Sequence, residues 1–286
     1  MKKLIVVLLV IIVFVTYLVY INNNRVILVS QYRDYHELNE YDTNRNTLKL
    51  LTYNIQHGVG TDGRLDLDRV ARVLEQSGAQ VVGLNEVDFA IKRSGFKNQV
   101  SYLAKSLNMN YAFGASVKRL TGSYGNAILS KYPINNVENY ILPGLDGDNI
   151  EARSLLIAEI EMPNNKKQEP FYIISTHLSL NKSERSEQIR WIDNFLSNLT
   201  GSYILMGDFN TGMEEIIYTI KDIKETPVRL IPLLNGVKTF PTVNPSQEID
   251  LYFSASPLEV VKGYSIESNA SDHLPVYLEL NLPKLS

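Results

Sequence analysis

Short apolar runs recur from Leu48 onward, and several of them end in an acidic, amide or imidazole side chain. Near the C-terminus, Asp250 lies inside such a run, and Asp272 and His273 precede the last one. Charged groups beside buried strands cost free energy unless they are paired or bind a ligand. The pattern therefore predicts strands whose polar ends converge at one edge of packed sheets. The other residues at these ends are Asn54, Asn85, Glu86, His177, Asp208 and Asn210.

A few helices separate these predicted strands. Apolar residues recur at helical spacing in three stretches, which begin at Leu67, Val100 and Ile189. Gly78 follows the first stretch as a stop signal, and Asn181 with Glu184 precedes the third as a capping box. Many strands with few helices favour an α/β class in which packed sheets are flanked by helices.

The N-terminus carries an uncharged segment long enough to cross a bilayer. Lys2 and Lys3 precede eighteen residues without charge, from Leu4 to Ile21, which as a helix would span roughly 27 Å. No small-x-small cleavage site follows, so the segment resembles an uncleaved anchor rather than a signal peptide. We predict a transmembrane helix over 1–21, a linker over 22–46 and one domain over 47–286. The two lysines favour a cytoplasmic N-terminus with the domain outside the cytoplasm, in a single-pass arrangement.

The composition excludes several kinds of site. The chain has 28 basic and 31 acidic residues, so its formal net charge of −3 provides no overall attraction for nucleic acid. Cysteine is absent, which rules out disulfides, thiolate metal sites and cysteine nucleophiles. The chain also lacks the G-x-S-x-G, G-x-x-x-x-G-K-[ST] and H-E-x-x-H motifs of serine hydrolases, P-loop nucleotide-binding proteins and zinc proteases.

The polar residues that remain suit the hydrolysis of a phosphate ester. Glu86 with the Asn54 amide supplies oxygen ligands that a hard cation such as Mg²⁺ or Mn²⁺ prefers. A histidine with a carboxylate partner is suited to activate water. Each residue has a structural alternative: Asn54 as a strand-end hydrogen bonder, for example, or His177 as a satisfied buried histidine.

Taken in order, seven short motifs resemble the endonuclease/exonuclease/phosphatase superfamily, the fold of pancreatic deoxyribonuclease. The resemblance runs from about Leu48 to Leu280, and the ordered set is far more specific than any one motif. Asn85 stands where these proteins usually have Gln, a change from which we expect little effect. The motifs are Tyr53-Asn54-Ile55-Gln56-His57-Gly58, Leu84-Asn85-Glu86-Val87-Asp88, Gly125-Asn126-Ala127-Ile128-Leu129-Ser130, Ser175-Thr176-His177-Leu178, Gly207-Asp208-Phe209-Asn210, Ile249-Asp250-Leu251-Tyr252 and Ser271-Asp272-His273-Leu274-Pro275-Val276.

The resemblance implies a four-layer α/β sandwich, two packed β-sheets flanked by helices, with the site at one edge. It also implies a metal site. Glu86 and Asn54 would bind Mg²⁺ or Mn²⁺, and Asp272 would either assist the metal or orient His273.

Catalytic roles follow from the same resemblance. His273, oriented by Asp250, would activate water, while Asp208 and Asn210 would position the nucleophile and the phosphate. His177 would stabilise the phosphoryl oxygens or protonate the leaving group.

Three further residues could belong to the site or serve the structure alone. Arg153 either contacts the phosphate or the metal-site carboxylates, or forms an ordinary ion pair. His57 lies near the expected metal but could only fix its loop, and Tyr124 either lines the cleft or covers the core.

The fold does not name a substrate. The first hypothesis is a membrane-tethered, metal-dependent phosphoesterase that cuts a phosphodiester, with a lipid head group as a candidate substrate, and that acts as a monomer. The second is an extracellular metal-dependent nuclease, for which Lys92, Arg93, Lys97, Lys118 and Arg119 offer a few cations in loops after Glu86. The third is a catalytically silent binding domain.

Overall fold

The computed structural model describes residues 27–30, 47–144, 151–162, 169–221 and 230–282. The transmembrane helix predicted over 1–21 lies outside these residues, and no helix among those described has the length and apolar character needed to cross a bilayer. Of the predicted linker, residues 27–30 are described. They form strand β1 (Ile27–Ser30), which pairs with a strand of the domain and so joins its sheet.

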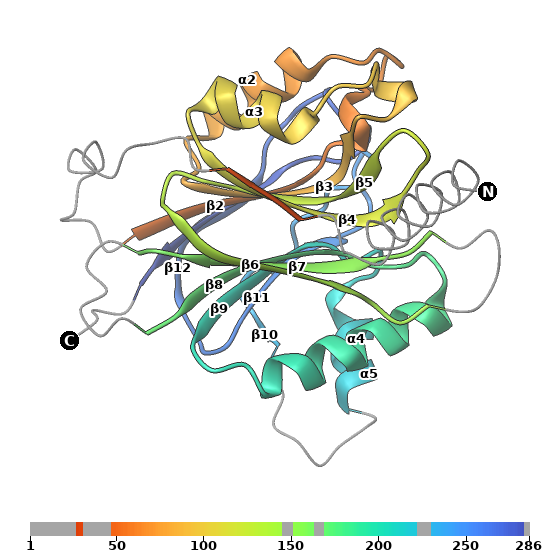
Figure 1. Cartoon of the computed structure of the whole chain (residues 1–286). Coiled ribbons are helices and arrows are strands. Elements are labelled where there is room, and N and C mark those ends of the chain that lie inside the picture. Colours follow the sequence, from red (N-terminus) through yellow and green to blue (C-terminus); the bar gives the residue numbers. More distant parts are fainter. Residues whose placement is uncertain (1–26, 31–46, 145–150, 163–168, 222–229, 283–286) are drawn as a thin grey trace, which may run out of the picture.

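Two mixed sheets face each other at the centre of the molecule (Figure 1). The first has the order β1-β4-β5-β3-β2-β13-β12. Its other strands are β2 (Thr47–Asn54), β3 (Val81–Phe89), β4 (Asn110–Lys118), β5 (Ser123–Ser130), β12 (Glu259–Ser265) and β13 (Val276–Asn281).

The second sheet has the order β10-β11-β9-β8-β7-β6. Its strands are β6 (Ile134–Ile141), β7 (Ser154–Ile160), β8 (Phe171–His177), β9 (Ser202–Asp208), β10 (Ile231–Pro232) and β11 (Asp250–Ser254).

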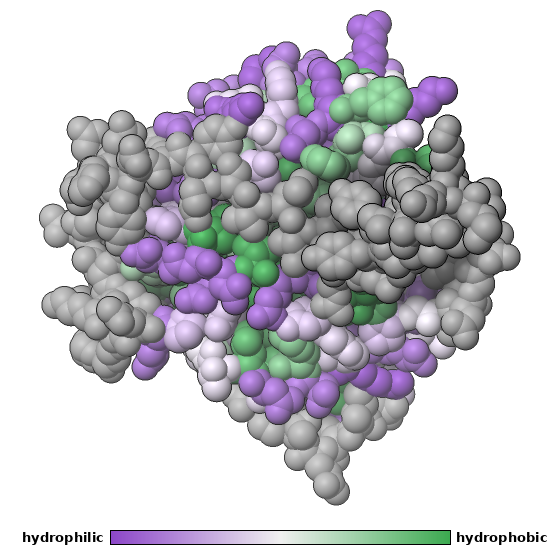
Figure 2. All heavy atoms as spheres, viewed as in Figure 1, coloured by the Kyte–Doolittle hydropathy of each residue, from purple (hydrophilic) through white to green (hydrophobic). Residues whose placement is uncertain are grey.

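Helices cover the outer face of each sheet, which completes the predicted four layers. Helices α2 (Leu67–Ser77) and α3 (Gln99–Leu107) cover the first sheet, and α4 (Lys182–Ser197) and α5 (Met213–Lys221) cover the second (Figure 1). Mainly hydrophilic side chains lie over α2 and α3 at the top of Figure 2. The three predicted helices are confirmed, whereas α5 was not predicted from the spacing of apolar residues. Two short 3₁₀ helices, η2 (Gln56–Gly58) and η3 (Lys92–Ser94), follow β2 and β3.

The helix ends follow the predicted capping chemistry with one difference. Gly78 ends α2 in the left-handed conformation at φ 64°, which glycine adopts without steric cost. Asn181 caps α4 by accepting from the backbone N–H of Ser183 and of Glu184. The Glu184 carboxylate does not close a reciprocal capping box, because it accepts from the Ser179 hydroxyl instead.

Each central strand buries both of its faces, which explains why the apolar runs are nearly continuous. In β2, Leu48 and Leu50 point into the core between the two sheets, whereas Leu51 and Tyr53 point toward α2 and α3. A third core lies between the second sheet and helices α4 and α5. With both faces filled, polar groups on these strands are displaced to the strand ends.

Parallel pairing then gathers those ends. Strand β2 runs parallel to β3 with Asn54 opposite Asn85, and β8 runs parallel to β9 with His177 opposite Asp208. Because parallel strands end at the same edge, each sheet contributes a neighbouring pair of polar residues there. The predicted convergence of polar strand ends is confirmed.

Candidate active site

Asp208 is the centre of the site, because it has a functional side chain on either side in its own sheet. His177 lies opposite it on β8, and Asp250 lies opposite it on the antiparallel strand β11. The three side chains are almost completely buried. Buried ionisable groups require partners, and this register supplies them through backbone pairing alone.

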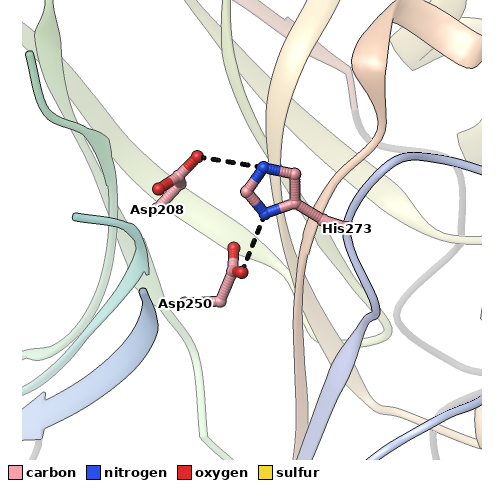
Figure 3. A group of neighbouring side chains, drawn as sticks. All are labelled: Asp208, Asp250 and His273. Carbon is pink, nitrogen blue, oxygen red and sulfur yellow. Dashed lines mark hydrogen bonds and ion pairs between the residues drawn. The ribbon is translucent and has the colours of Figure 1, made fainter. Parts of the chain in front are cut away.

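His273 lies between the two aspartates (Figure 3). Its Nδ1 is 2.9 Å from Asp250 Oδ2, and its Nε2 is 3.7 Å from Asp208 Oδ2. Thr239 donates its hydroxyl to the same Asp250 oxygen at 2.5 Å, and the Phe240 ring lies 4.8 Å from the imidazole ring. The predicted Asp250–His273 pair is therefore present and is fixed in position by its surroundings.

The charges in this group change its acid–base behaviour. Burial lowers the pKa of His273, but the charge and hydrogen bond of Asp250 and the charge of Asp208 outweigh it and raise this pKa to about 10. Burial and the negative charge of Asp250 raise the pKa of Asp208 to about 6. Burial thus opposes the charge on both groups, while His273 and Asp208 each favour the charged form of the other.

His177 has a different protonation state because a cation lies beside it. Burial and the charge of Arg153 lower its pKa well below the usual value, so the ring is neutral. Arg153 Nη1 lies 3.0 Å from His177 Nδ1. A guanidinium only donates, so Nδ1 accepts and the ring proton is on Nε2. His177 Nε2 lies 3.4 Å from Asp208 Oδ2, which can accept its proton. The Asn210 amide nitrogen lies 3.0 Å from Nε2, but it is itself a donor and therefore forms no hydrogen bond with Nε2–H in this tautomer.

Asn210 is held next to His177 by backbone contacts. It adopts the left-handed conformation at φ 52°, its N–H donates to Asp208 Oδ1, and its side-chain amide donates to the Leu178 carbonyl. The predicted grouping of His177, Asp208 and Asn210 is thus found, with Arg153 as a buried partner. Arg153 also pairs with Glu151 at 3.3 Å.

Glu86 faces this cluster from the first sheet. The pairing of β3 with β5 shifts between Leu84 and Val87, and Glu86 takes a φ of 59° at this irregularity. Its Oε2 lies 3.9 Å from His57 Nδ1, and its Oε1 accepts from the Asn54 amide at 3.3 Å. Burial raises the pKa of Glu86, but its interactions with His57, His177 and Asn54 outweigh burial and hold the pKa at about 2.

Asn54 connects Glu86 to Asp208. Its amide nitrogen lies 3.3 Å from Glu86 Oε1 and 3.0 Å from Asp208 Oδ2, and its Oδ1 accepts from the Gln56 N–H. One amide therefore bridges carboxylates from the two sheets. His57 and Gln56 both have positive φ angles in this turn, and His57 contacts Glu86 as one of its two interpretations predicted.

Asn85 connects the two sheets through its side chain. Its side chain is fully buried, and its Oδ1 accepts from the backbone N–H of Asp208. Its amide nitrogen donates to the Thr176 carbonyl and the Asn126 side chain. This residue therefore hydrogen-bonds the first sheet to the second directly behind the catalytic cluster.

Asp272 lies beside the cluster but is held apart from Glu86. It accepts from Gln56 Nε2 at 3.0 Å and from the Ser271 hydroxyl at 3.2 Å. Within the described part of the chain, these contacts tie it to the η2 turn, and no ion pair or hydrogen bond joins it to Glu86. Its negative charge also contributes to the raised pKa of His273, while its predicted roles at the metal or in orienting His273 stay predictions.

Tyr124 and Arg93 form the wall next to Glu86. Tyr124 is buried, and burial with the charges of Glu86 and Glu151 raises its pKa. The Arg93 guanidinium lies 5.1 Å from the centre of the Tyr124 ring and forms two hydrogen bonds with the fully buried Asp88. Arg93 therefore covers the Tyr124 ring near Glu86, a contact that the sequence pattern does not reveal.

The donor chemistry of this site fits a divalent cation. Glu86, Asp208 and Asp250 bring three carboxylates together against the charges of His273 and Arg153, and Asp250 Oδ1 is buried with no hydrogen-bond partner among the described residues. Asp208, Asp250 and His273 also place one donor atom each within 4.8 Å of the others. His273 uses both nitrogens on carboxylates, however, so carboxylate oxygens such as those of Glu86 are the better ligands. Asn54 turns its amide nitrogen toward Glu86, and its oxygen accepts from the Gln56 N–H.

A family model for the endonuclease/exonuclease/phosphatase family matches residues 51–273. This chain belongs to that family. The match includes every predicted site residue, from Asn54 to His273. Members of this family are phosphoester hydrolases, and the family is generally dependent on divalent metal ions.

Individual relatives are more distant. The Escherichia coli protein YbhP is 25% identical over 255 residues, which cover 84% of this chain and 98% of YbhP. A mannosyl-6-phosphatase from Bacteroides thetaiotaomicron superposes with a TM-score of 0.62 at 18% identity, over 82% of this chain and 100% of that one. A D. rerio TDP2 structure with a single-strand DNA product gives a TM-score of 0.61 at 20% identity, over 82% and 99% of the two chains. At such identities, these structures establish the shared fold.

Proposed function

We propose that this protein is a phosphodiesterase that requires Mg²⁺ or Mn²⁺ and is held at the outer face of the cytoplasmic membrane by residues 1–21. The single observation that carries the chemistry is the position of Asp208. It lies between the neutral His177 and the cationic His273, and the Asn54 amide connects it to the ionised Glu86. Such a site combines a proton acceptor, proton donors and a cation-binding carboxylate.

Glu86 and Asn54 would hold the cation, which would neutralise charge on the phosphate and polarise its ester bond. Asp208 accepts a proton from water, because its pKa of about 6 lies close to neutral pH, where a general base is most effective. His273, expected from sequence to be the base, instead keeps its proton and stabilises the ionised form of Asp208.

The groups of the second sheet act on the phosphate itself. The Asn210 amide and the His177 Nε2–H point to the same space beside Asp208, where they can donate to phosphoryl oxygens as negative charge develops. Arg153 holds His177 in the tautomer that donates there. Water then forms a bond to phosphorus as the bond to the leaving alcohol breaks, and the leaving oxygen takes up a proton.

A lipid head group is the proposed substrate class, and the support is the uncharged segment from Leu4 to Ile21. An anchor keeps the site within reach of the bilayer and so raises the local concentration of a lipid substrate. The nuclease alternative has support of its own, since a structure with the same fold holds a single-strand DNA product.

The test uses the full chain in detergent with bis-p-nitrophenyl phosphate, p-nitrophenyl phosphate, phospholipid micelles and duplex DNA as substrates, in Mg²⁺, Mn²⁺ or EDTA. Metal-dependent release from the diester and the phospholipid is expected, and it should fall about 10³-fold in Asp208→Asn. Glu214→Gln, an exposed carboxylate on α5, is the matched control and should retain full activity. Release from the monoester alone would identify a phosphatase, and cleavage of DNA alone would identify a nuclease. Either result would overturn the proposal.

A further inference from the structure

Two loops lie side by side at the active-site edge of the first sheet. Residues 90–98 follow the end of β3, close after Glu86, and residues 119–122 form the turn between β4 and β5. Ser123 pairs with both Phe89 and Lys118, and Gly122 packs so closely that an added Cβ would lie 2.0 Å from the Phe89 carbonyl oxygen. Figure 1 shows the two loops next to each other at the upper right.

These loops carry a strong local excess of positive charge. The two loops hold four basic residues, and Lys118 at the end of β4 adds a fifth; all five are exposed, and neither loop sequence contains an aspartate or a glutamate. Asp88, at the end of β3, pairs with Arg93. The whole protein has a net charge of −3, so this excess does not reflect its general composition. The basic residues are Lys92, Arg93, Lys97, Lys118 and Arg119.

Each loop also exposes a large apolar side chain among these cations. Phe96 is 56% exposed, and Leu120 is fully exposed at the tip of the β4–β5 turn. Phe96 has a φ of 59° and its N–H donates to the Ile91 carbonyl, so a backbone conformation that bulky residues rarely adopt presents its ring outward. Hydrophobic and hydrophilic side chains lie next to one another at the upper right of Figure 2, where the loop after β3 lies.

We infer that this surface, the basic rim of residues 90–98 and 118–122, docks on the anionic surface of a phospholipid bilayer. Its cations would lie among lipid phosphates, with Phe96 and Leu120 inserted between the head groups. Basic residues around exposed apolar side chains have the chemistry of interfacial membrane binding. The inference deepens the proposed function and rests on it, because docking at the rim would turn the Glu86 side of the site toward lipid head groups.

The same cations could face a nucleic acid, whose backbone is also anionic. The apolar tips decide between these partners. A fully exposed leucine has no role in contacting phosphates, whereas it gains free energy on entering the apolar part of a bilayer. The nucleic-acid partner is therefore treated as an outcome of the test.

The absence of cysteine allows the rim to be labelled at single positions in the full chain. Phe96→Cys and Leu120→Cys would each carry an environment-sensitive fluorophore, with Val261→Cys as the matched control. Val261 is 51% exposed and lies next to Lys262 on β12. This strand forms the edge of the first sheet on the far side of β3 from β4 and β5. The anchored protein would be placed in nanodiscs of phosphatidylcholine alone, or of phosphatidylcholine mixed with phosphatidylglycerol.

Labels at 96 and 120 should shift to the blue and be quenched by lipid-borne quenchers in anionic discs, and the label at 261 should not. Reversing two charges, with Lys118→Glu and Arg119→Glu together, should reduce the fraction of molecules with the rim docked on the bilayer about tenfold. Lys262→Glu should leave that fraction unchanged. Equal signals at 96, 120 and 261 would overturn the proposal. So would labels that respond to a single-stranded oligonucleotide but not to anionic discs. Hydrolysis of the soluble diester is measured separately, so loss of docking and loss of catalysis are distinguishable.

Discussion

Glu86 and Asp208 are two carboxylates joined by one amide, yet their surroundings drive their proton affinities in opposite directions. Asn54 contacts both of them. Glu86 also lies near His57, and its pKa is held at about 2, whereas Asp208 is buried beside Asp250 and its pKa is raised to about 6. A permanently ionised group suits a cation ligand, and a group near its pKa suits proton transfer. The contrast separates the two roles within one site.

The largest expected effect comes from removing the proton acceptor. Asp208→Asn should lower kcat for diester hydrolysis by about 10³-fold or more, because the amide cannot accept a proton from water. Its affinity for Mn²⁺, measured by calorimetry, should stay close to that of the unaltered protein if the cation is held by Glu86 and Asn54. A large loss of Mn²⁺ affinity would instead show that Asp208 is a metal ligand, and it would contradict the separate roles of Glu86 and Asp208.

The complementary change acts on the first sheet. Glu86→Gln should weaken Mn²⁺ binding by about 100-fold, since a ligating carboxylate is lost and only the Asn54 amide remains. Activity at low Mn²⁺ should fall to a similar extent and recover in part with excess metal. If kcat falls while the Mn²⁺ concentration that gives half-maximal activity stays the same, Glu86 acts on the substrate and not on the cation.

A smaller effect is expected from the partner of His177. Arg153→Lys retains a positive charge but loses the planar group that contacts both His177 and Glu151. We expect kcat to fall about tenfold, with little change in Mn²⁺ affinity. Arg190→Lys, an exposed position on α4, is the control. Nitrogen NMR of the imidazole should show Nε2 protonated in the unaltered protein and a mixture of tautomers in Arg153→Lys. A single tautomer in both would remove the role assigned to Arg153.

The smallest effect is on stability, and its sign differs between the two carboxylates. The raised pKa of Asp208 means that its contribution to folding is favourable below about pH 4 and is lost as pH rises through about 6. The lowered pKa of Glu86 gives stability above about pH 4.5 that is lost as pH falls through about 2.

In EDTA at pH 7, Asp208→Asn should therefore raise Tm and Glu86→Gln should lower it, each by about 2–4 °C for a change near 1 kcal/mol. The increase in Tm from Asp208→Asn should disappear at pH 4. Calorimetric scans of the three proteins at both pH values provide the measurement, and shifts of the same sign for both variants would contradict the comparison.

Much of the fold and of the cluster follows from the sequence because it depends on local patterns. Apolar runs that end in polar residues predict strand ends that converge at one edge, and the parallel pairing found there places His177 beside Asp208. The helical stripes of α2, α3 and α4 and the cap at Asn181 were also readable. Helix α5 was not recognised, although it is as long as α3 and its Met213, Ile216 and Ile220 fall at helical spacing.

Other parts of the site depend on contacts that no spacing encodes. Thr239 follows no apolar run, yet its hydroxyl fixes Asp250. The amide of Asn85 reaches the backbone of the other sheet, a contact that appears only once the sheets pack. The pKa values depend on burial and on distances between elements far apart in sequence. Sequence reasoning therefore identified His273 as part of the site but held no information on its charge.

The most direct test of the central claim is the Mn²⁺ dependence of bis-p-nitrophenyl phosphate hydrolysis by the full chain, compared with Asp208→Asn. The account predicts that EDTA abolishes release, that Mn²⁺ restores it with a saturable midpoint, and that Asp208→Asn releases product about 10³-fold more slowly at every metal concentration. Release that is indifferent to EDTA, or that continues at an unreduced rate in Asp208→Asn at saturating Mn²⁺, would contradict a metal-dependent site centred on Asp208.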